Sequence, residues 1–152
     1  MNGVREVNEY KIKDLDHYLS LWTHIHSSSD GPSWDHILPY YDKNIYFRDT
    51  VQEIRGIEAF AEMTKRLSKK SKKIEMVIHN SSKKGDMIFV EWEMRISYKQ
   101  YPKTSIYGVS RTTLKDGKII EQRDYYDLWG DIFDNIKFFG KGYRRFMRKR
   151  FG

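Results

Sequence analysis

The sequence contains no cysteine, only three prolines and no long run of apolar residues. The absence of cysteine excludes disulfides, thiolate nucleophiles, iron–sulfur clusters and cysteine zinc sites. No stretch approaches the roughly 18 consecutive apolar residues of a membrane-spanning helix. The segment from Met1 to Lys13 also lacks the apolar region of a secretory signal. We therefore expect a cytoplasmic protein.

Acidic residues are absent from the C-terminal tail, and the net charge of +7 therefore lies in this tail. After Asp134 the chain has seven bases, so 21 of its 28 Lys and Arg residues remain to balance its 21 acids. The body is therefore neutral overall, although a second basic cluster lies at 65–73. Such clusters usually form a solvated helix face, but they can also attract nucleic acid or anionic lipid.

The composition is that of one globular domain, because 152 residues with 39% hydrophobic and 32% charged side chains suffice for a single core. Apolar residues recur at helical spacing from Leu15 to Ile25, with Asp14 as the expected cap. Similar patterns predict a short helix over 33–41 and a third helix from Ile57 to Leu67, and a short strand is expected at 44–49.

The second half of the sequence alternates as strands do. Period-2 patterns predict strands over 73–80, 87–98, 104–114 and 119–128, with hairpin turns at 81–86 and 115–118. Helices followed by long strands indicate an α+β domain in which the helices cover a curved antiparallel sheet. The tail from Asp131 to Phe151 is predicted to be helical.

Three motifs carry a family resemblance: IYFRDTV at 45–51, IRG at 54–56, and DGKII at 116–120 followed by QRDYYD at 122–127. Together they resemble the nuclear transport factor 2-like superfamily, and within it the SnoaL-like proteins and limonene-1,2-epoxide hydrolase, closest to uncharacterised bacterial members. The resemblance covers roughly residues 10 to 130. It implies a cone-shaped, cystatin-like fold, in which three N-terminal helices pack on a curved antiparallel sheet around an apolar pocket. We expect residues 1–130 to form this domain and 131–152 to form an appended basic amphipathic helix.

The last predicted strand supplies the leading catalytic candidate. Period 2 places Gln122, Asp124 and Tyr126 on one face, and the resemblance implies that this face looks into the pocket. Asp124 is then a general acid or base whose pKa burial can raise. Alternatively, Asp124 only bonds to a neighbouring strand or helix end. We also expect Gln122, Tyr126 and Trp22 to contact a ligand.

The likeness to epoxide hydrolases implies further site residues, with departures from the family pattern. Tyr46 falls at the position of the family's Tyr, but Arg48 falls where the family has Asn. Counting back from Asp124 by the family's interval places Glu93 at the position of the family's second acidic residue and Glu91 at the position of the family's Arg. The Arg-x-Asp element is therefore absent in its expected form. This departure weakens a hydrolase assignment, because an epoxide oxygen needs a proton donor as well as an activated water.

Glu91, Glu93 and Arg95 share one face of a central strand, where three ionisable groups are costly if the face is dry. Either they line a polar pocket, with Glu93 catalytic and Glu91 and Arg95 binding a ligand, or they lie on an outer face in solvent or at a subunit interface. Tyr107 is a further binding candidate, and Arg111 and Asp49 are of second rank.

Cofactor signatures are missing from the sequence. The five histidines lack the converging spacing of metal ligands, and there is no phosphate-binding glycine loop or nucleophile elbow. We expect no metal and no cofactor. The leading hypothesis is a pocket protein for a small hydrophobic molecule, using isomerase, cyclase or hydrolase chemistry if it is an enzyme. The rival is a non-catalytic homodimer, a binding or interaction module with a basic tail; nucleic-acid binding is unlikely.

The tail has two competing placements. Its apolar stripe of Phe139, Tyr143, Phe146 and Met147 packs on its own domain or partner, or it enters the headgroup layer of an anionic membrane while bases within 137–150 contact the lipid. We favour packing on the protein, because the helix is short and contains Gly140 and Gly142. A homodimer is expected in either case, because relatives of this family commonly pair through the open face of the sheet.

Overall fold

The computed structural model describes residues 10–28, 31–133 and 136–152. The helices are α1 (Leu15–Thr23), α2 (Ile57–Lys70), α3 (Leu128–Asp131) and α4 (Phe139–Phe151), with a 3₁₀ turn η1 (Leu38–Tyr40). The strands are β1 (His26–Ser28), β2 (Gly31–Ser33), β3 (Tyr41–Arg48), β4 (Glu53–Arg55), β5 (Ser71–Lys84), β6 (Met87–Tyr98), β7 (Thr104–Lys115) and β8 (Lys118–Tyr126). The α+β class predicted from the sequence is confirmed.

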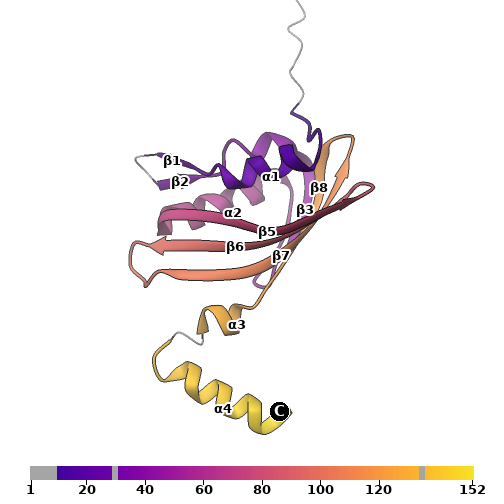
Figure 1. Ribbon diagram of the computed structural model, residues 1–152. Helices are drawn as coiled ribbons and strands as arrows, with labels where there is room; N and C mark the ends of the chain where they lie inside the picture. Colours follow the sequence, from indigo (N-terminus) through magenta and orange to yellow (C-terminus); the bar gives the residue numbers. More distant parts are fainter. Residues whose placement is uncertain (1–9, 29–30, 134–135) are drawn as a thin grey trace, which may run out of the picture.

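Six strands form one curved sheet in the order β4-β3-β8-β7-β6-β5 (Figure 1). All neighbours run antiparallel except β3 and β8, which run parallel. The prediction of a wholly antiparallel sheet is therefore wrong at this pair. The long crossover from β3 to β8 contains β4, α2 and three strands, and a connection of this length allows parallel pairing where a hairpin does not.

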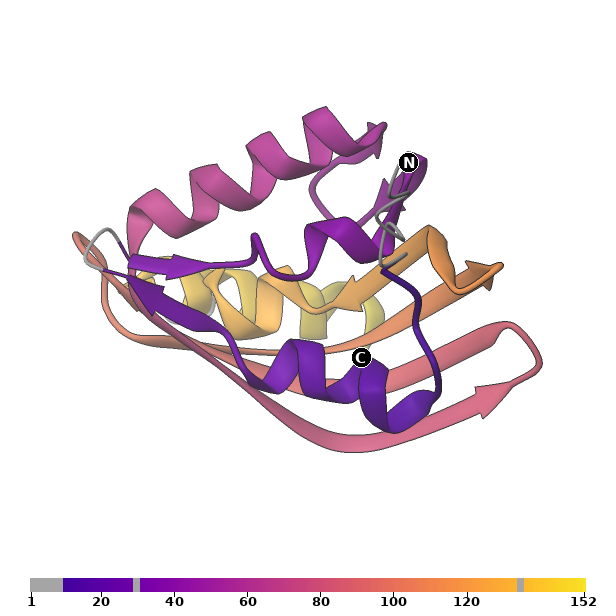
Figure 2. The same cartoon turned by 90° about the horizontal axis from the view of Figure 1, so that it is seen from above.

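Helices α1 and α2 lie over the same face of the sheet (Figure 2). Helix α1 begins where the sequence predicted, because the Asp14 side chain accepts a hydrogen bond from the His17 N–H at 2.8 Å. Its Tyr18 is buried, as are Phe60 and Thr64, which lie one turn apart on α2. These side chains face the alternate residues of the strands, so the core and the functional cavity both lie between the helices and the sheet.

The helix predicted over 33–41 is reduced to turns and the 3₁₀ segment η1. Its backbone bonds span three residues: the Ile37 N–H donates to Trp34 O, and the Tyr40 N–H donates to Ile37 O, both at 2.9 Å. Nine residues are too few for a helix to be stable on its own. Burial of Trp34 and Ile37 in the core decides the local conformation instead.

The hairpin between β5 and β6 turns later than predicted. The expected turn at 81–86 is mostly strand, because Ser81, Ser82 and Lys83 pair with residues of β6. Only Gly85, which has φ +57°, and Asp86 form the turn. The polar and basic composition of 81–84 indicated a loop, but the ladder extends through these exposed positions.

The C-terminus contains two helices in place of one, and α4 projects away from the sheet (Figure 1). The Trp129 ring of α3 stacks on Tyr143 at 4.8 Å between ring centroids, and Phe139 packs on Phe133 at 5.9 Å. Phe146 and Phe151 remain 61% and 75% exposed. The apolar face of α4 is therefore divided: Phe139, Tyr143 and the half-buried Met147 lie towards the α3 region, whereas Phe146 and Phe151 face outward.

Candidate active site

A cavity of about 350 Å³ lies between the inner face of the sheet and the helices. Most of its wall is apolar and aromatic, including Trp22, Trp34, Phe60, Met94 and Ile106. Val51, Arg66 and Lys70 also line the cavity and are exposed, so its opening lies between the β3–β4 loop and the C-terminal half of α2. The size and lining are typical of a site for a small apolar molecule.

Asp124 of β8 is one of two carboxylates in this wall, the other being Asp49. Its Oδ1 accepts hydrogen bonds from Ser110 Oγ at 2.6 Å and from Gln122 Nε2 at 3.0 Å. Its Oδ2 receives only a longer bond from Gln122 Nε2, at 3.3 Å. Oδ2 is therefore the oxygen with more freedom to exchange a proton with a ligand.

A chain of hydrogen bonds holds Asp124 from the β7 side. The indole Nε1 of Trp92 donates to Ser110 Oγ at 2.8 Å, and Ser110 donates in turn to Asp124. Trp92 of β6 lies directly opposite Gly108 of β7. A Cβ at Gly108 would lie 2.5 Å from the Trp92 ring, so only glycine lets the indole lie flat over β7 and reach Ser110.

Buried phenols surround the deeper end of the cavity. Tyr41 donates from its hydroxyl to Gln122 Oε1 at 2.5 Å, which fixes the amide so that its nitrogen faces Asp124. Tyr18 shares a hydrogen bond of 2.7 Å with Thr112 Oγ1. The Trp22 ring packs against Tyr18 at 6.4 Å between centroids. The buried hydroxyls of Tyr18 and Tyr41 thus have partners that fix their orientation.

Burial sets the protonation states in the cavity. It raises the pKa of Asp124 to about 6; the hydrogen bonds from Ser110 and Gln122 oppose this shift, and the nearby charge of Asp49 adds to it. Burial also raises the pKa of Tyr18 and Tyr41, so these phenols stay protonated. The site therefore combines a carboxyl that titrates near neutral pH with neutral hydrogen-bond donors.

Asp49 and Tyr126 form a second polar pair in the wall. The Tyr126 hydroxyl donates to Asp49 Oδ2 at 3.3 Å, which is a long and weak bond. Burial, reinforced by Asp49, raises the pKa of Tyr126. Tyr126 is therefore a neutral donor whose present partner is easily exchanged for a ligand oxygen.

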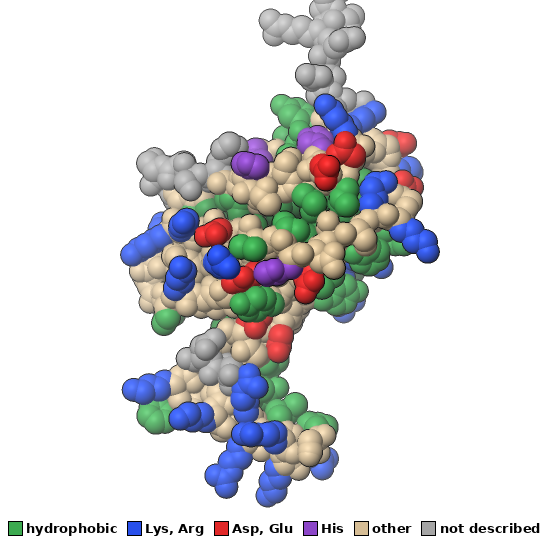
Figure 3. All heavy atoms as spheres, in the orientation of Figure 1, with side chains coloured by type: hydrophobic (Ala, Val, Ile, Leu, Met, Phe, Trp, Pro, Cys, Tyr) green, Lys and Arg blue, Asp and Glu red, His purple; other side chains and the backbone are tan. Residues whose placement is uncertain are grey.

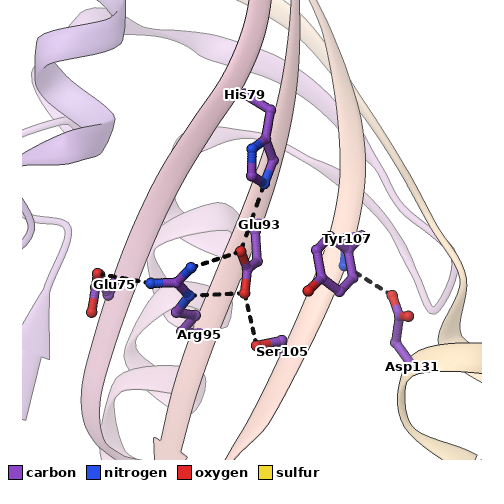
Figure 4. A network of polar contacts seen from close by, with 7 residues as sticks. All are labelled: Glu75, His79, Glu93, Arg95, Ser105, Tyr107 and Asp131. Carbon is purple, nitrogen blue, oxygen red and sulfur yellow. Dashed lines mark hydrogen bonds and ion pairs between the residues drawn. The ribbon is translucent and has the colours of Figure 1, made fainter.

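The polar cluster around Glu93 lies on the opposite, outer face of the sheet (Figure 4). Glu93 accepts from Arg95 Nε at 2.8 Å and Nη2 at 3.0 Å, and from Ser105 Oγ at 2.9 Å. His79 Nε2 lies 3.6 Å from the same carboxylate. The hydrogen bonds from Arg95 lower the pKa of Glu93 to about 2, although burial opposes this shift. Glu93 is thus held ionised, unlike Asp124.

The structure separates the residues expected at the site into two groups. Asp124, Gln122, Tyr126 and Trp22 line the cavity. The others lie outside its wall: Glu91, Glu93, Arg95, Tyr107, Tyr46 and Arg48. For Glu91, Glu93 and Arg95 this is the outer-face alternative that the sequence left open. The expectation that Tyr46, Arg48 and Tyr107 lie in the pocket with Asp124 is corrected. Period 2 puts Trp92 and Met94 inward, so their neighbours in the strand must point outward.

Three polar cavity residues were not among the expected site residues, namely Tyr18, Tyr41 and Ser110. Nor were Thr112 and Gly108, which lie outside the cavity wall and contact Tyr18 and Trp92. The sequence carried one usable signal, because Ser110 and Thr112 lie on the same face of a predicted strand as Ile106 and Leu114. The contacts of Tyr18 and Tyr41 join residues more than eighty positions apart, and no local pattern reports them. Among the described residues, no cluster of three His, Asp or Glu side chains could hold a metal ion.

A model of the SnoaL-like domain matches residues 13–122, which contain most of the residues that line the cavity but end before Asp124 and Tyr126. The chain belongs to the SnoaL-like family. The nuclear transport factor 2-like resemblance stated from the sequence is thereby confirmed. No curated protein matches this SnoaL-like domain in sequence.

Solved structures share the fold at low sequence identity. A putative SnoaL-like polyketide cyclase from Jannaschia sp. CCS1 has a TM-score of 0.59 and 20% identity over 64% of this chain and 75% of that one. A hypothetical protein with a ketosteroid isomerase-like fold from Catenulispora acidiphila, in complex with trimethylamine, has a TM-score of 0.64 and 14% identity over 75% and 88%. A limonene epoxide hydrolase-like enzyme from M. tuberculosis has a TM-score of 0.57 and 19% identity over 76% and 83%.

Proposed function

We propose that the SnoaL-like domain binds a small hydrophobic molecule in its cavity and that Asp124 moves a proton to or from it. One observation carries the proposal: an apolar cavity contains a carboxyl whose pKa burial raises to about 6. A general base works best when its pKa lies near the operating pH. Burial also favours the neutral form of Asp124, so accepting a proton relieves the cost of the buried charge.

Isomerase or cyclase chemistry fits this geometry better than hydrolysis. Asp124 Oδ2 takes a proton from a carbon next to a ligand carbonyl, and the Tyr126 hydroxyl donates to the oxygen on which negative charge develops. Tyr46 and Arg48, which occupy the positions of the hydrolase family's Tyr and Asn, lie on the outer face and not beside Asp124. The likeness to a putative polyketide cyclase supports a ligand with enolisable carbonyl groups.

Hydrogen–deuterium exchange tests the chemistry without knowledge of the natural substrate. The purified protein is incubated in D2O with a panel of hydrophobic ketones, and mass spectrometry follows deuterium uptake at the carbon beside each carbonyl. We expect accelerated uptake for ketones that fit the cavity, and its loss by a factor of about 10² to 10⁴ in Asp124→Asn. Asp116→Asn, the same change in an exposed turn, is the matched control.

Two results would overturn this proposal. If the ketones take up deuterium equally fast with Asp124→Asn and with Asp116→Asn, Asp124 has no part in the proton transfer. The other result combines two observations. Deuterium uptake is no faster than in buffer for every ketone of the panel, and native mass spectra show a copurified ligand that both variants bind equally. The domain would then be a carrier and not an enzyme.

A second role is favoured by the C-terminal helix, whose bases gather away from the body (Figure 3). Exposed aromatic side chains accompany them, including Phe138, Phe146 and Phe151. We propose that α4 docks on an anionic membrane surface, with these rings in the headgroup layer and its bases near lipid phosphates. Among the described residues, no helix is long and apolar enough to cross a membrane.

Vesicle cosedimentation tests the docking. We expect binding to phosphatidylglycerol-containing vesicles but not to pure phosphatidylcholine, with loss at high salt. Arg145→Gln/Arg148→Gln/Lys149→Gln should weaken binding, whereas the charge-matched control Lys69→Gln/Lys72→Gln/Lys84→Gln should not. Equal loss of vesicle binding in both triple variants would show that the attraction is not specific to α4. Full binding by Phe146→Ser/Phe151→Ser would show that neither ring enters the headgroup layer.

The homodimer stays a prediction. The outer face exposes several large apolar side chains at once, namely Phe89, Tyr107, Val109 and Tyr125. A face of this kind is suited to cover by a second copy. Light scattering at micromolar concentration tests it, and a mass of one 18.3 kDa chain would count against it.

A further inference from the structure

Three arginines lie side by side on the outer face, on three neighbouring strands. Arg123 of β8 is in register with Arg48 of β3 on one side and with Arg111 of β7 on the other. Neighbouring strands are only about 4.8 Å apart. Like charges directly opposite each other destabilise a sheet unless something neutralises them.

The protein neutralises this row only in part. Arg111 Nη2 donates to Glu121, but within the described chain no carboxylate lies at ion-pair distance from Arg48 or Arg123. Glu53 is in register with Arg48, yet its carboxylate pairs with Arg55 at 3.5 Å. Three guanidinium charges less the one carboxylate of Glu121 leave a local charge of +2.

Hydrogen-bond donors in the row are also unused. The Nε atoms of Arg111 and Arg123 are buried and have no hydrogen-bond partner among the described residues. A buried donor without an acceptor destabilises the folded state, and more strongly when it is charged. Arg48, Arg111 and Arg123 line a surface hollow of about 300 Å³, whose walls include Tyr46 and Tyr125. The Arg123 guanidinium lies over the Tyr125 ring at 4.9 Å, which fixes the orientation of its donors.

We propose that Arg48, Arg111 and Arg123 form a binding site for a dianionic oxyanion of the phosphate monoester class. A dianion matches the local charge of +2, whereas a single carboxylate does not. Phosphate oxygens accept several N–H bonds at once, and guanidinium groups bind them in a planar, often bidentate geometry. Tyr46 and Tyr125 supply flat walls for an organic group on the ester. The site lies across the sheet from the cavity and does not depend on the proposed chemistry of Asp124.

Thermal unfolding in inorganic phosphate, phenyl phosphate and chloride at matched ionic strength tests the site. For the natural sequence we expect a saturable rise in Tm with either phosphate and none with chloride. Arg123→Gln should weaken phosphate binding by about tenfold or more, as expected for loss of a charged hydrogen-bond donor. Arg145→Gln on α4 is the control of the same residue type, and it should keep the full response.

A second readout separates binding from a merely structural role. Without phosphate, Arg123→Gln should unfold at a higher temperature than the natural sequence, because it removes the like-charge contacts with Arg48 and Arg111. A lower Tm in chloride would overturn the proposal, since Arg123 would then stabilise the sheet without an anion. The proposal would also be overturned if Arg145→Gln lost the phosphate-dependent rise in Tm to the same extent as Arg123→Gln. A change of mass in light scattering with no phosphate response would assign the row to contacts with a second copy.

Discussion

The inner and outer faces of the same sheet each hold a carboxylate, and the two behave in opposite ways. Asp124 faces the cavity and accepts hydrogen bonds from the neutral side chains of Ser110 and Gln122, and burial raises its pKa to about 6. Glu93 is also a buried residue, yet the guanidinium of Arg95 holds its pKa at about 2. Burial alone therefore does not decide the protonation state of a carboxyl; the charge of its partner does.

This contrast separates a site for proton transfer from a structural network. A carboxylate fixed by an arginine gives up its proton too readily to act as a general base near pH 7. One held by Ser110 and Gln122 keeps a pKa in the useful range. The same sheet thus has a reactive side and an ion-paired side, and the following changes should alter one without the other.

The largest effect on stability is expected from Asp124→Asn. At pH 7 the natural protein keeps a charge in the cavity, and a pKa raised from 3.8 to about 6 corresponds to a cost of up to about 3 kcal/mol. The variant should therefore be more stable at pH 7. The stability of the natural protein should rise as the pH falls from about 6 to 4, because the folded state then binds more protons than the unfolded state. Urea unfolding across this range measures the difference, and a variant less stable at pH 7 would contradict the assignment.

Gly108→Ala should disturb the inner face through packing. The new Cβ would lie 2.5 Å from the Trp92 ring, so the indole must move and its bond to Ser110 must lengthen or break. Overpacking of this kind costs roughly 1–3 kcal/mol. Urea unfolding measures the loss, while Gly142→Ala provides the control, because a Cβ at Gly142 meets nothing within 4 Å. Equal losses would show that the close approach of Trp92 is unimportant.

Glu93→Gln should alter the outer face in a pH-dependent manner. The pKa of Glu93 is lowered in the folded state, so its contribution to stability is fully present above about pH 4.5 and is lost as the pH falls towards 2. The variant should be less stable than the natural protein at pH 7, and the two should converge in acid. Acid unfolding followed by circular dichroism tests this, and exchange of the ketone panel should be unaffected. A constant difference between pH 7 and pH 2 would mean that the ion pair contributes nothing.

The smallest effect on stability is expected at α4. Phe146→Ser/Phe151→Ser removes two largely exposed rings, so the free energy of unfolding should change by no more than about 0.5 kcal/mol per site. By contrast, Trp129→Ser should lower the melting temperature of the C-terminal region, because Trp129 packs on Phe133 and Tyr143. A large loss of stability in Phe146→Ser/Phe151→Ser would contradict this expectation, because it would mean that the two rings are buried against another surface.

Much of the fold followed from local patterns. Alternation located β6, β7 and β8 to within a few residues, because one face of each strand is buried. The cap at Asp14 and the helical spacing located α1 and α2. The 33–41 segment was misjudged, because apolar residues at helical spacing there serve the core through turns. The hairpin at 81–86 was misplaced, because polar, exposed strand residues look like a loop in sequence.

The candidate site was only partly within reach of the sequence. Asp124, Gln122 and Tyr126 were found because they share a strand face. Glu93 and Arg48 were assigned by counting along the chain, and such counts shift when turns differ in length. Which side chains of a strand point into the cavity depends on which side of the sheet the helices cover. This is a property of the assembled sheet.

The sequence by itself determined the composition of a single α+β domain, its strands and helices, its neutral body and its basic C-terminus, because these depend on residue type and local period. Only the tertiary structure decided which carboxylate is reactive. The pKa of Asp124 and that of Glu93 depend on burial and on partners from other strands and helices. The contacts of Tyr41 with Gln122 and of Tyr18 with Thr112 cross more than eighty residues of chain, so they exist only once β3, β7, β8 and α1 have assembled.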